Sequence, residues 1–214
     1  MFIIFSAIIV KKSEKQVSIM KIICIGDSLT FGYGVWRNDC WVSLLAKTTG
    51  LKVLNHGING DTSAYMLQRA KGSVLTEEAE SGDIVIIMGG ANAVLMYGAD
   101  ENDVRNIIKI AELAKSKGCT PIIGIQPGFR PSYYAFYGPL DPNKLNNNFD
   151  HFAELLLKEA DSREITTFDL RQILADPELF EDGVHPTEEG HELIKDTVLQ
   201  VLKPYLPDPD HQPE

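Results

Sequence analysis

Short apolar runs alternate with amphipathic stretches along most of the chain, and this alternation restricts the possible folds more than any other feature. The runs are rich in Ile and Val and mostly apolar on both faces, which is typical of parallel strands covered on two sides by helices. We therefore predict a three-layer α/β/α sandwich around a five-stranded parallel sheet with right-handed crossovers. The predicted strands are 21–25, 52–54, 84–88, 121–125 and 165–168.

Three amphipathic stretches predict helices, because their apolar residues recur at helical spacing. Thr187, followed by Glu188 and Glu189, predicts the cap and acidic first turn of the last helix, and Pro204 and Pro207 predict its end. The apolar positions are Val104, Ile107, Ile108, Ala111 and Ala114 in the first stretch, Leu145, Phe149, Phe152 and Leu156 in the second, and Leu193, Ile194, Val198, Val201, Leu202 and Tyr205 in the third.

The composition is that of one acidic globular domain. A chain of 214 residues is long enough for one well-packed core and too short for two ordinary domains. Its formal net charge of −10 repels phosphate backbones, so nucleic acid is not expected as a partner.

The three cysteines, Cys24, Cys40 and Cys119, are odd in number and lack the spacing of metal ligands. Cys24 and Cys119 lie in or beside apolar runs, where buried thiols are expected. A disulfide framework is therefore not expected, and the sequence favours a reducing, cytoplasmic location over a secreted or membrane-associated one.

The first residues differ from the rest of the chain. Residues 1–10 are almost wholly apolar and three lysines follow within 11–15, whereas a secretory signal carries its positive charge before the apolar part. Such a short run cannot cross a bilayer. We interpret 1–19 as a leader that arises from an upstream start codon, with a membrane-associating anchor as the alternative and the one expected route to membrane contact. The predicted domain covers 20–206, and 207–214 form a tail.

Five loops follow the predicted strands at their carboxyl ends, and we expect the functional site there. In open parallel sheets, functional residues gather at this edge. The loops begin near Gly26, Asn55, Gly89, Gln126 and Asp169.

Ser28 lies directly after the first predicted strand, in a glycine-bearing turn. A serine hydroxyl is a weak nucleophile until a base removes its proton, and the usual base is a histidine oriented by a carboxylate. Asp182 lies three residues before His185, in a turn that Pro186 stiffens, so it can bond the far nitrogen of that ring. Taken singly, the first turn is equally an ordinary turn or a helix cap formed by Asp27 or Ser28, and the second an ordinary surface turn.

Two further loops contain groups that can donate hydrogen bonds to an oxyanion. Gly60 has no side chain to block the approach of a substrate to its backbone N–H, and Asn92 carries a donor amide. Acyl transfer needs such preorganised donors, each worth roughly 3 kcal/mol. As single features, glycine and asparagine are also common in ordinary strand-to-helix turns.

Together and in this order, these elements resemble the SGNH hydrolase superfamily, the GDSL-type lipases and acylhydrolases. The resemblance covers about 21–206. Ser28, Gly60, Asn92 and His185 match the four residues that give the superfamily its name, and Asp182 matches the acid of its D-x-x-H pair. The resemblance implies a flavodoxin-like sandwich, a triad of Ser28, His185 and Asp182, and an oxyanion hole formed by Ser28, Gly60 and Asn92.

The resemblance also implies a two-step acyl transfer on a small-molecule ester or thioester, with no metal or organic cofactor. The stretch 32–35 looks like the lysophospholipase and thioesterase branch, while a carbohydrate O-deacetylase or an arylesterase would use the same machinery. One position departs from the family, whose third block commonly reads G-x-N-D. Here Ala93 follows Asn92, so a carboxylate that could brace the Asn92 loop is absent.

An aromatic segment, 129–137, follows the fourth predicted strand and should reach the site end of the sheet. It predicts a pocket wall or a lid, with packing of a long loop or a dimer contact as alternatives. The candidate substrate-contacting residues are Asp27, Tyr33, Met96, Tyr97, Phe129 and Tyr133.

The remaining histidines are not expected to be catalytic. His56 is predicted to be a turn residue that bonds its own backbone neighbours, and His191 to lie on the polar side of the last helix. Asp150, His151 and Glu154 have a helical spacing that could hold a metal ion, but a solvated helix face explains them more simply.

Two other classes of function use the same sandwich. A flavin- or phosphate-binding module would need a first loop rich in Ser and Thr donors, whereas this loop carries Ser28 with the bulky Phe31 and Tyr33. A catalytically dead interaction domain would not need Ser28, Asp182 and His185. The sequence therefore favours an esterase-type acylhydrolase.

Overall fold

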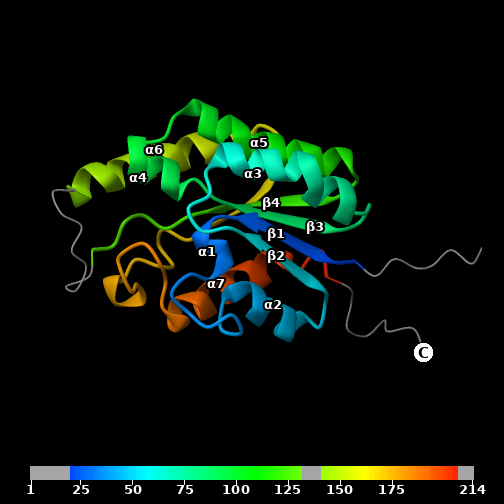
Figure 1. Cartoon of the computed structure of the whole chain (residues 1–214), viewed down its shortest axis with the longest axis horizontal. Helices are drawn as coiled ribbons and strands as arrows, with labels where there is room; N and C mark the ends of the chain where they lie inside the picture. The colour runs from blue at the N-terminus through cyan, green and yellow to red at the C-terminus, as the bar shows by residue number, and fades with distance from the viewer. Residues whose placement is uncertain (1–19, 132–140, 207–214) are drawn as a thin grey trace, which may run out of the picture.

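The computed structural model describes residues 20–131 and 141–206, which form a layered α/β structure (Figure 1). All strands of its sheet are parallel and lie in the order β2-β1-β3-β4-β5. They are β1 (Ile22–Gly26), β2 (Val53–Gly57), β3 (Ile84–Met88), β4 (Thr120–Ile125) and β5 (Thr166–Asp169). The predicted sandwich with a five-stranded parallel sheet is confirmed. The predicted leader, 1–19, and tail, 207–214, lie outside the described residues.

The largest difference between predicted and observed strands concerns β2. We expected this strand to end at 54 and a loop to begin near Asn55, but the strand continues through Gly57. Asn55 and His56 pair in register with Cys24 and Ile25 of β1. β2 lies at the edge of the sheet and most of its side chains are only half-buried, so polar residues are tolerated within it.

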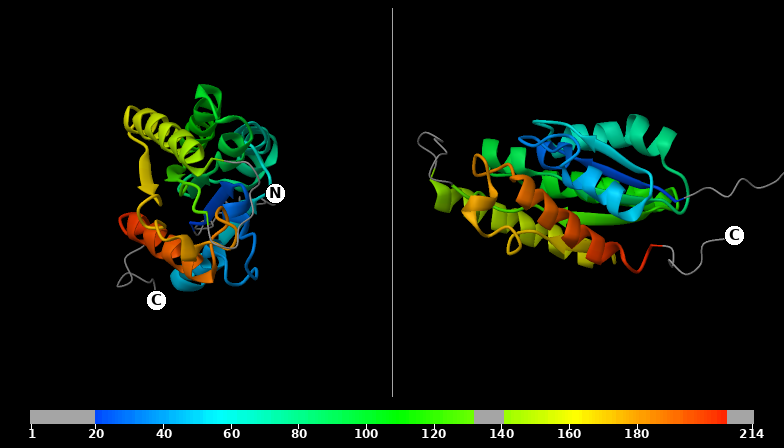
Figure 2. Two further views of the ribbon diagram at one scale, coloured as in Figure 1. Left: turned by 90° about the vertical axis from the view of Figure 1, so that its left-hand side faces the viewer. Right: turned by 90° about the horizontal axis from the view of Figure 1, so that it is seen from below.

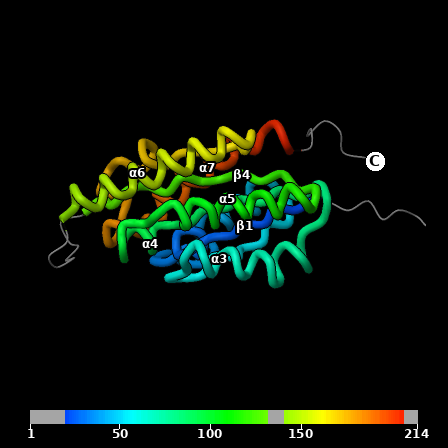
Figure 3. The backbone as a smooth tube through the Cα atoms, turned by 90° about the horizontal axis from the view of Figure 1, so that it is seen from above, coloured from blue at the N-terminus to red at the C-terminus, as the bar shows by residue number. Residues whose placement is uncertain are grey.

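Helices cover both faces of the sheet (Figure 1, Figure 2). One face carries α3 (Ser63–Arg69), α4 (Ala91–Tyr97), α5 (Glu101–Ser116) and α6 (Pro142–Asp161), and the other carries α2 (Trp41–Thr49) and α7 (Glu188–Leu202). Figure 3 shows the first group from above, with its helices lying side by side over the sheet. The shorter elements are α1 (Ser28–Phe31), the π-helical η1 (Ala70–Glu78) and the 3-10 helix η2 (Pro177–Leu179). None of the helices in the described ranges combines the length and apolar character needed to cross a bilayer.

The last helix, α7, begins as predicted and buries Ile194, Val198 and Leu202 as expected, but its buried face also includes His191. The Thr187 hydroxyl accepts the N–H of Gly190 and caps the helix. His191 was predicted to lie on the polar side, but it is fully buried because it shares a face with Ile194 and Val198. The predicted buried positions that are only half-buried are Leu193, Val201 and Tyr205.

The sheet separates two hydrophobic cores. Successive side chains of β1 alternate between them, with Ile23 and Ile25 on the α3–α6 side and Ile22 and Cys24 on the α2–α7 side. The three cysteines are buried free thiols, as expected for Cys24 and Cys119, and burial raises the pKa of Cys24.

Two glycines at the ends of β1 and β2 allow α1 to pack closely against the sheet. A Cβ atom on Gly57 would overlap the backbone of Phe31, and a Cβ atom on Gly26 would overlap the Thr30 side chain and the Met88 carbonyl. A larger residue at either position would push α1 away from the sheet. The place of Ser28 therefore depends on both glycines.

Candidate active site

Ser28 is presented by α1, which starts directly after β1. Asp27 caps this helix, because its carboxylate accepts the N–H of Leu29 at 3.1 Å. Ser28 is the first residue of the helix, where backbone N–H groups have no acceptor within the helix. The Ser28 N–H is therefore available to an oxygen atom outside the helix.

His185 and Asp182 approach Ser28 from a distant part of the chain, since Ser28 and His185 are 157 residues apart. His185 Nε2 lies 3.0 Å from Ser28 Oγ, and His185 Nδ1 lies 2.6 Å from Asp182 Oδ2. When Nδ1 carries the ring proton, Nε2 is left as an acceptor for the serine proton. The arrangement has the geometry of a nucleophile, a base and an orienting acid.

The acid of this group is ionised at neutral pH. Burial alone would raise the pKa of Asp182, but hydrogen bonds from the His185 ring and from the backbone N–H groups of His185 and Val184 lower it to about 2. The two backbone bonds, at 2.8 and 3.0 Å, reach Asp182 Oδ1 and leave Oδ2 to the ring. The carboxylate can therefore both orient the imidazole and stabilise its protonated form.

The turn 182–185 is anchored at its base and in its middle. Phe180 and Pro186 form an isolated antiparallel bridge across the base. In the middle, the Gly183 carbonyl accepts the N–H of Arg130 at 2.8 Å. Gly183 has a φ of +82°, and a Cβ atom there would lie 2.7 Å from the Arg130 carbonyl oxygen. This position therefore requires glycine.

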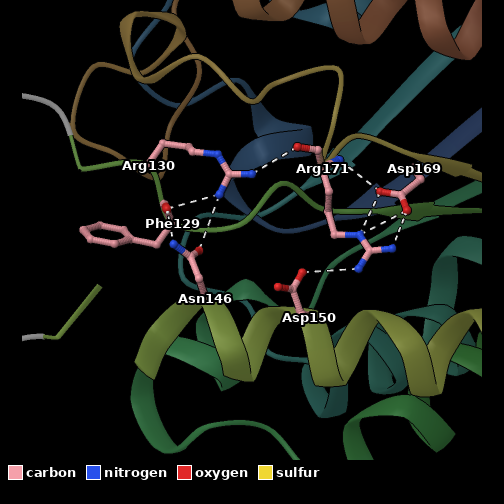
Figure 4. A network of polar contacts seen from close by, with 6 residues as sticks. All are labelled: Phe129, Arg130, Asn146, Asp150, Asp169 and Arg171. Carbon is pink, nitrogen blue, oxygen red and sulfur yellow. Dashed lines mark hydrogen bonds and ion pairs between the residues drawn. The ribbon is translucent and has the colours of Figure 1, made fainter. Parts of the chain in front are cut away.

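Arg130 is itself held by the polar network shown in Figure 4. Its Nη2 donates to the Arg171 carbonyl at 3.0 Å. Arg171 in turn pairs with Asp169 at the end of β5 at 2.7 Å and with Asp150 on α6 at 3.3 Å. Through Arg130, the turn that carries His185 is thus connected to β5 and α6.

The predicted oxyanion donors lie in the loop after β2 and at the start of α4. Gly60 is exposed with a φ of +75°, and a Cβ atom there would meet nothing within 4 Å. Asn92 Nδ2 donates one hydrogen to the Asp61 carbonyl at 2.8 Å, which leaves its second hydrogen for another acceptor. Ala93, at the position that departs from G-x-N-D, is fully buried, and the Asp61 carbonyl holds the Asn92 amide.

Arg69 on α3 connects this donor loop to the ends of β1 and β2. Its Nε and Nη2 donate to Asp61 Oδ2 at 2.9 and 2.5 Å. Its Nη1 donates to the His56 carbonyl at 3.1 Å, and Nη2 also reaches the Gly26 carbonyl at 3.3 Å. Arg69 therefore holds both strand ends and the residue that bonds Asn92 in one arrangement.

Asp27 does not reach the space where a substrate would lie, so the prediction that it contacts substrate was wrong. Its side chain is fully buried. The carboxylate accepts hydrogen bonds from Gln126 Nε2, at 3.0 and 2.9 Å, and from the Leu29 N–H. Burial raises the pKa of Asp27 to about 6, although these hydrogen bonds oppose the rise. The alternative interpretation of Asp27 as a helix cap is confirmed.

Tyr33, Met96 and Tyr97 are exposed, and the structure places Tyr33 beside His185 of the turn 182–185. The centroids of the Tyr33 and His185 rings are 4.4 Å apart. Met96 and Tyr97 lie at the end of α4, and the Tyr97 hydroxyl donates to Asp103 at 3.2 Å. That these three residues contact substrate stays a prediction.

The aromatic segment after β4 is described only in part. Phe129 is 1% exposed and belongs to the core on the α3–α6 side, so the prediction that it lines a pocket was wrong. Tyr133 and the rest of the segment from 132 onward lie outside the described residues.

Two histidine predictions were wrong. His56 is not a turn residue, because β2 extends past it, and its Nε2 lies 3.0 Å from Glu78 Oε2. His191 accepts the N–H of Trp41 at its Nδ1, at 3.3 Å. Burial, together with the nearby His185, lowers the pKa of His191 to about 4, so this ring is neutral at physiological pH.

The helical trio with metal-ligand spacing does not gather into a site. Asp150 forms its ion pair with Arg171, and His151 and Glu154 are exposed on α6. Within 20–131 and 141–206, no three His, Cys, Asp or Glu side chains are grouped so that they could hold a metal ion.

Sequence reasoning missed Arg69, Gln126 and Arg130. Gln126 carried a positional signal, because it begins the loop after β4 at the carboxyl edge of the sheet. Arg69 and Arg130 carried none, since several of their partners are backbone carbonyls of segments distant in the chain.

Comparison with known proteins shows which family and which solved structures the chain is similar to. The model of the GDSL-like lipase/acylhydrolase family matches residues 24–193. The chain is 27% identical over 194 residues to an arylesterase of Vibrio mimicus, a match that covers 87% of this chain and 90% of that protein. It is 24% identical over 191 residues to the "Thioesterase 1/protease 1/lysophospholipase L1" of Escherichia coli (strain K12), covering 86% and 84%. A solved structure of a member of the lipolytic protein G-D-S-L family from Veillonella parvula DSM 2008 has a TM-score of 0.75 at 25% identity, covering 86% of this chain and 99% of that one.

Proposed function

Because the chain belongs to the GDSL-like lipase/acylhydrolase family and is an esterase-type acylhydrolase, we propose that it cleaves carboxylic esters or thioesters through a triad of Ser28, His185 and Asp182. One observation carries the proposal. An unbroken line of hydrogen bonds runs from Asp182 Oδ2 through both ring nitrogens of His185 to Ser28 Oγ, at 2.6 and 3.0 Å. Such a chain of hydrogen bonds allows the histidine to remove the proton of the serine hydroxyl.

The reaction proceeds in two steps through a covalent acyl-enzyme. Ser28 Oγ attacks the carbonyl carbon while His185 Nε2 takes the hydroxyl proton, and His185 then gives that proton to the leaving alcohol or thiol. Water attacks the acyl group next, with His185 taking a proton from the water and returning it to Ser28 as the acid product leaves. Asp182 stays ionised throughout and stabilises the imidazolium.

The oxyanion of each tetrahedral intermediate is stabilised by three donors, which are the N–H groups of Ser28 and Gly60 and the free hydrogen of the Asn92 amide. Two features support this assignment. The Gly60 position is open, with no protein atom within 4 Å of a Cβ atom built there. The Asn92 amide is held by the Asp61 carbonyl through only one of its two hydrogens.

The substrate class is an acyl ester or thioester with an apolar group, as for a lysophospholipase or thioesterase. The name of the Escherichia coli relative supports this class, and so do the exposed side chains of Tyr33, Met96 and Tyr97 at the carboxyl edge of the sheet. An arylesterase is the second candidate, because the Vibrio mimicus relative carries that name.

Replacement of the nucleophile tests the proposal. In Ser28→Ala, we expect hydrolysis of a short-chain aryl ester to fall by about 10⁴-fold or more, because no acyl-enzyme forms. An aryl organophosphonate should label the wild-type protein on the peptide that contains Ser28 and should not label the variant. Ser73→Ala, at an exposed serine, is the matched control and should keep wild-type activity. Activity that survives in Ser28→Ala would refute the triad.

A substrate series separates the two candidates. Aryl esters and acyl-thioesters of increasing chain length, run beside acetylated sugars, should show the highest kcat/KM on thioesters or long-chain esters if the first candidate is right. A preference for short aryl esters would favour the arylesterase.

A further inference from the structure

A buried polar pair beside the nucleophile has no part in the mechanism above. Asp27 precedes Ser28 and is fully buried, and Gln126, directly after β4, is 7% exposed. Gln126 Nε2 donates to both carboxylate oxygens of Asp27, at 3.0 and 2.9 Å. The two residues are 99 positions apart, so the contact joins the end of β4 to the turn that carries Ser28.

The other end of the Gln126 amide is also bonded. Its Oε1 accepts the N–H of Ala91 at 2.7 Å, and Ala91 directly precedes Asn92 at the start of α4. Only one orientation of the amide satisfies both neighbours, because the carboxylate needs a donor and the backbone N–H needs an acceptor. A single side chain therefore connects the turn that carries Ser28 to the start of α4, which carries Asn92.

We propose that Gln126 is a positioning residue that sets the separation between Ser28 and the Asn92 amide by bridging Asp27 and the Ala91 N–H. The proposal rests on the proposed function, because it concerns the spacing of the nucleophile and an oxyanion donor. Such a bridge affects the rate by fixing the distance between the reacting groups. A misplacement of about 1 Å at a reacting centre lowers the rate roughly 100-fold.

The hydrogen bond from Gln126 also affects the protonation state of Asp27. Burial raises the pKa of Asp27 to about 6, whereas the hydrogen bonds from Gln126 and from the Leu29 N–H lower it. The ionisable groups that act on Asp27 are His185, which lowers its pKa, and Asp61, which raises it and is itself paired with Arg69. Loss of Gln126 would therefore move the pKa of Asp27 upward and favour the neutral carboxyl group.

The first experiment removes both hydrogen bonds while keeping most of the volume. In Gln126→Leu, we expect kcat on a saturating short-chain aryl ester to fall by about 10- to 100-fold with little change in KM. Gln68→Leu, at an exposed glutamine on α3, is the matched control and should change neither quantity.

The second experiment keeps the shape of the side chain and remains usable if Gln126→Leu does not fold. In Gln126→Glu, one carboxylate oxygen can still accept the Ala91 N–H, and the other can bond Asp27 only while the two carboxyl groups share a proton. Near neutral pH, the variant should keep kcat within about threefold of wild type, because adjacent carboxylates raise the pKa of the pair. At alkaline pH, the shared proton is lost, and kcat should fall along a limb that the wild-type protein lacks.

The outcomes are distinct from those that test the triad. A folded Gln126→Leu with wild-type kcat would overturn the proposal, as would a Gln126→Glu profile without the new alkaline limb. Either result would leave the triad intact, provided that Ser28→Ala is inactive. Conversely, an active Ser28→Ala would remove the triad itself, whatever the Gln126 variants show.

Discussion

The two turns that meet at the candidate nucleophile are built in different ways. The Ser28 turn is held by buried groups from distant segments, with Asp27 bonded by Gln126 from 99 residues away. The turn 182–185 is half-exposed, and its acid is bonded by N–H groups at most three residues away. The two acids accordingly shift in opposite directions, since the pKa of Asp27 rises to about 6 and that of Asp182 falls to about 2.

This difference predicts that substitutions in the two turns affect stability and rate differently. A substitution around Asp27 leaves buried donors or acceptors without partners, at a cost of about 1–3 kcal/mol each, so stability and rate should change together. A substitution of Asp182 changes which nitrogen of the His185 ring carries the proton and disturbs little of the core. We therefore expect activity and stability to be coupled in the first turn and independent in the second.

The largest expected effect is that of Asp182→Asn. The new amide oxygen can still accept the backbone N–H groups of Val184 and His185, but the amide nitrogen now faces His185 Nδ1 and favours the wrong ring tautomer. We expect kcat to fall by about 10⁴-fold while thermal unfolding changes little. Steady-state kinetics and thermal melts measure the two quantities. If the variant melted far below wild type, the Asp182 side chain would stabilise more of the fold than the turn 182–185.

A smaller effect is expected for Asn92→Ala, which removes a donor amide held by the Asp61 carbonyl. We expect kcat to fall by roughly 100-fold or more. Asn147→Ala, at an exposed asparagine on α6, should behave as wild type in the same assay. A loss below about tenfold would show that the Asn92 amide is not an effective donor and that the Ser28 and Gly60 N–H groups suffice.

The smallest effects concern two glycines with positive φ, Gly60 in the loop after β2 and Gly183 in the turn 182–185. Gly60→Ala should lose about 1 kcal/mol of unfolding free energy, because only the left-handed backbone is strained. Gly183→Ala should lose about 1 kcal/mol more, because its Cβ atom would also lie 2.7 Å from the Arg130 carbonyl oxygen. Urea unfolding of the pair measures the difference. Equal losses would mean that the Arg130 contact does not constrain the turn 182–185.

The sequence predicted the sheet and the contact between Asp182 and His185 because both depend on local patterns. The strands are short apolar runs, and Asp182 and His185 are three residues apart, so their contact follows from one turn. The whole-chain order of the motifs then placed Ser28 beside them, as the observed 3.0 Å contact bears out.

The wrong predictions concern residues whose hydrogen-bond partners lie far away in the sequence, so that no local pattern indicates them. The contacts of Gln126 with Asp27 and of Arg69 with the Gly26 carbonyl span 99 and 43 residues, and glutamine and arginine are residue types usually found at the surface. Asp27 was therefore assigned to the substrate side rather than to the interior. His191 was misplaced because the helix face was predicted from the apolar residues alone. Its ring is buried and accepts the backbone N–H of Trp41, a partner 150 residues away in the chain.

The strand order has a consequence for how enzymes of this kind diverge. β1 and β3 are neighbours in the sheet, yet the chain leaves them toward opposite faces, to α2 in one case and to α4 and α5 in the other. In open parallel sheets, ligands bind at the carboxyl ends of the strands where such a reversal occurs, because the loops from the two neighbouring strands diverge there and leave a crevice. Loop exchange on either side can therefore remodel substrate choice while the strands stay unaltered, which makes this reversal the natural place to begin directed evolution of new acyl preferences.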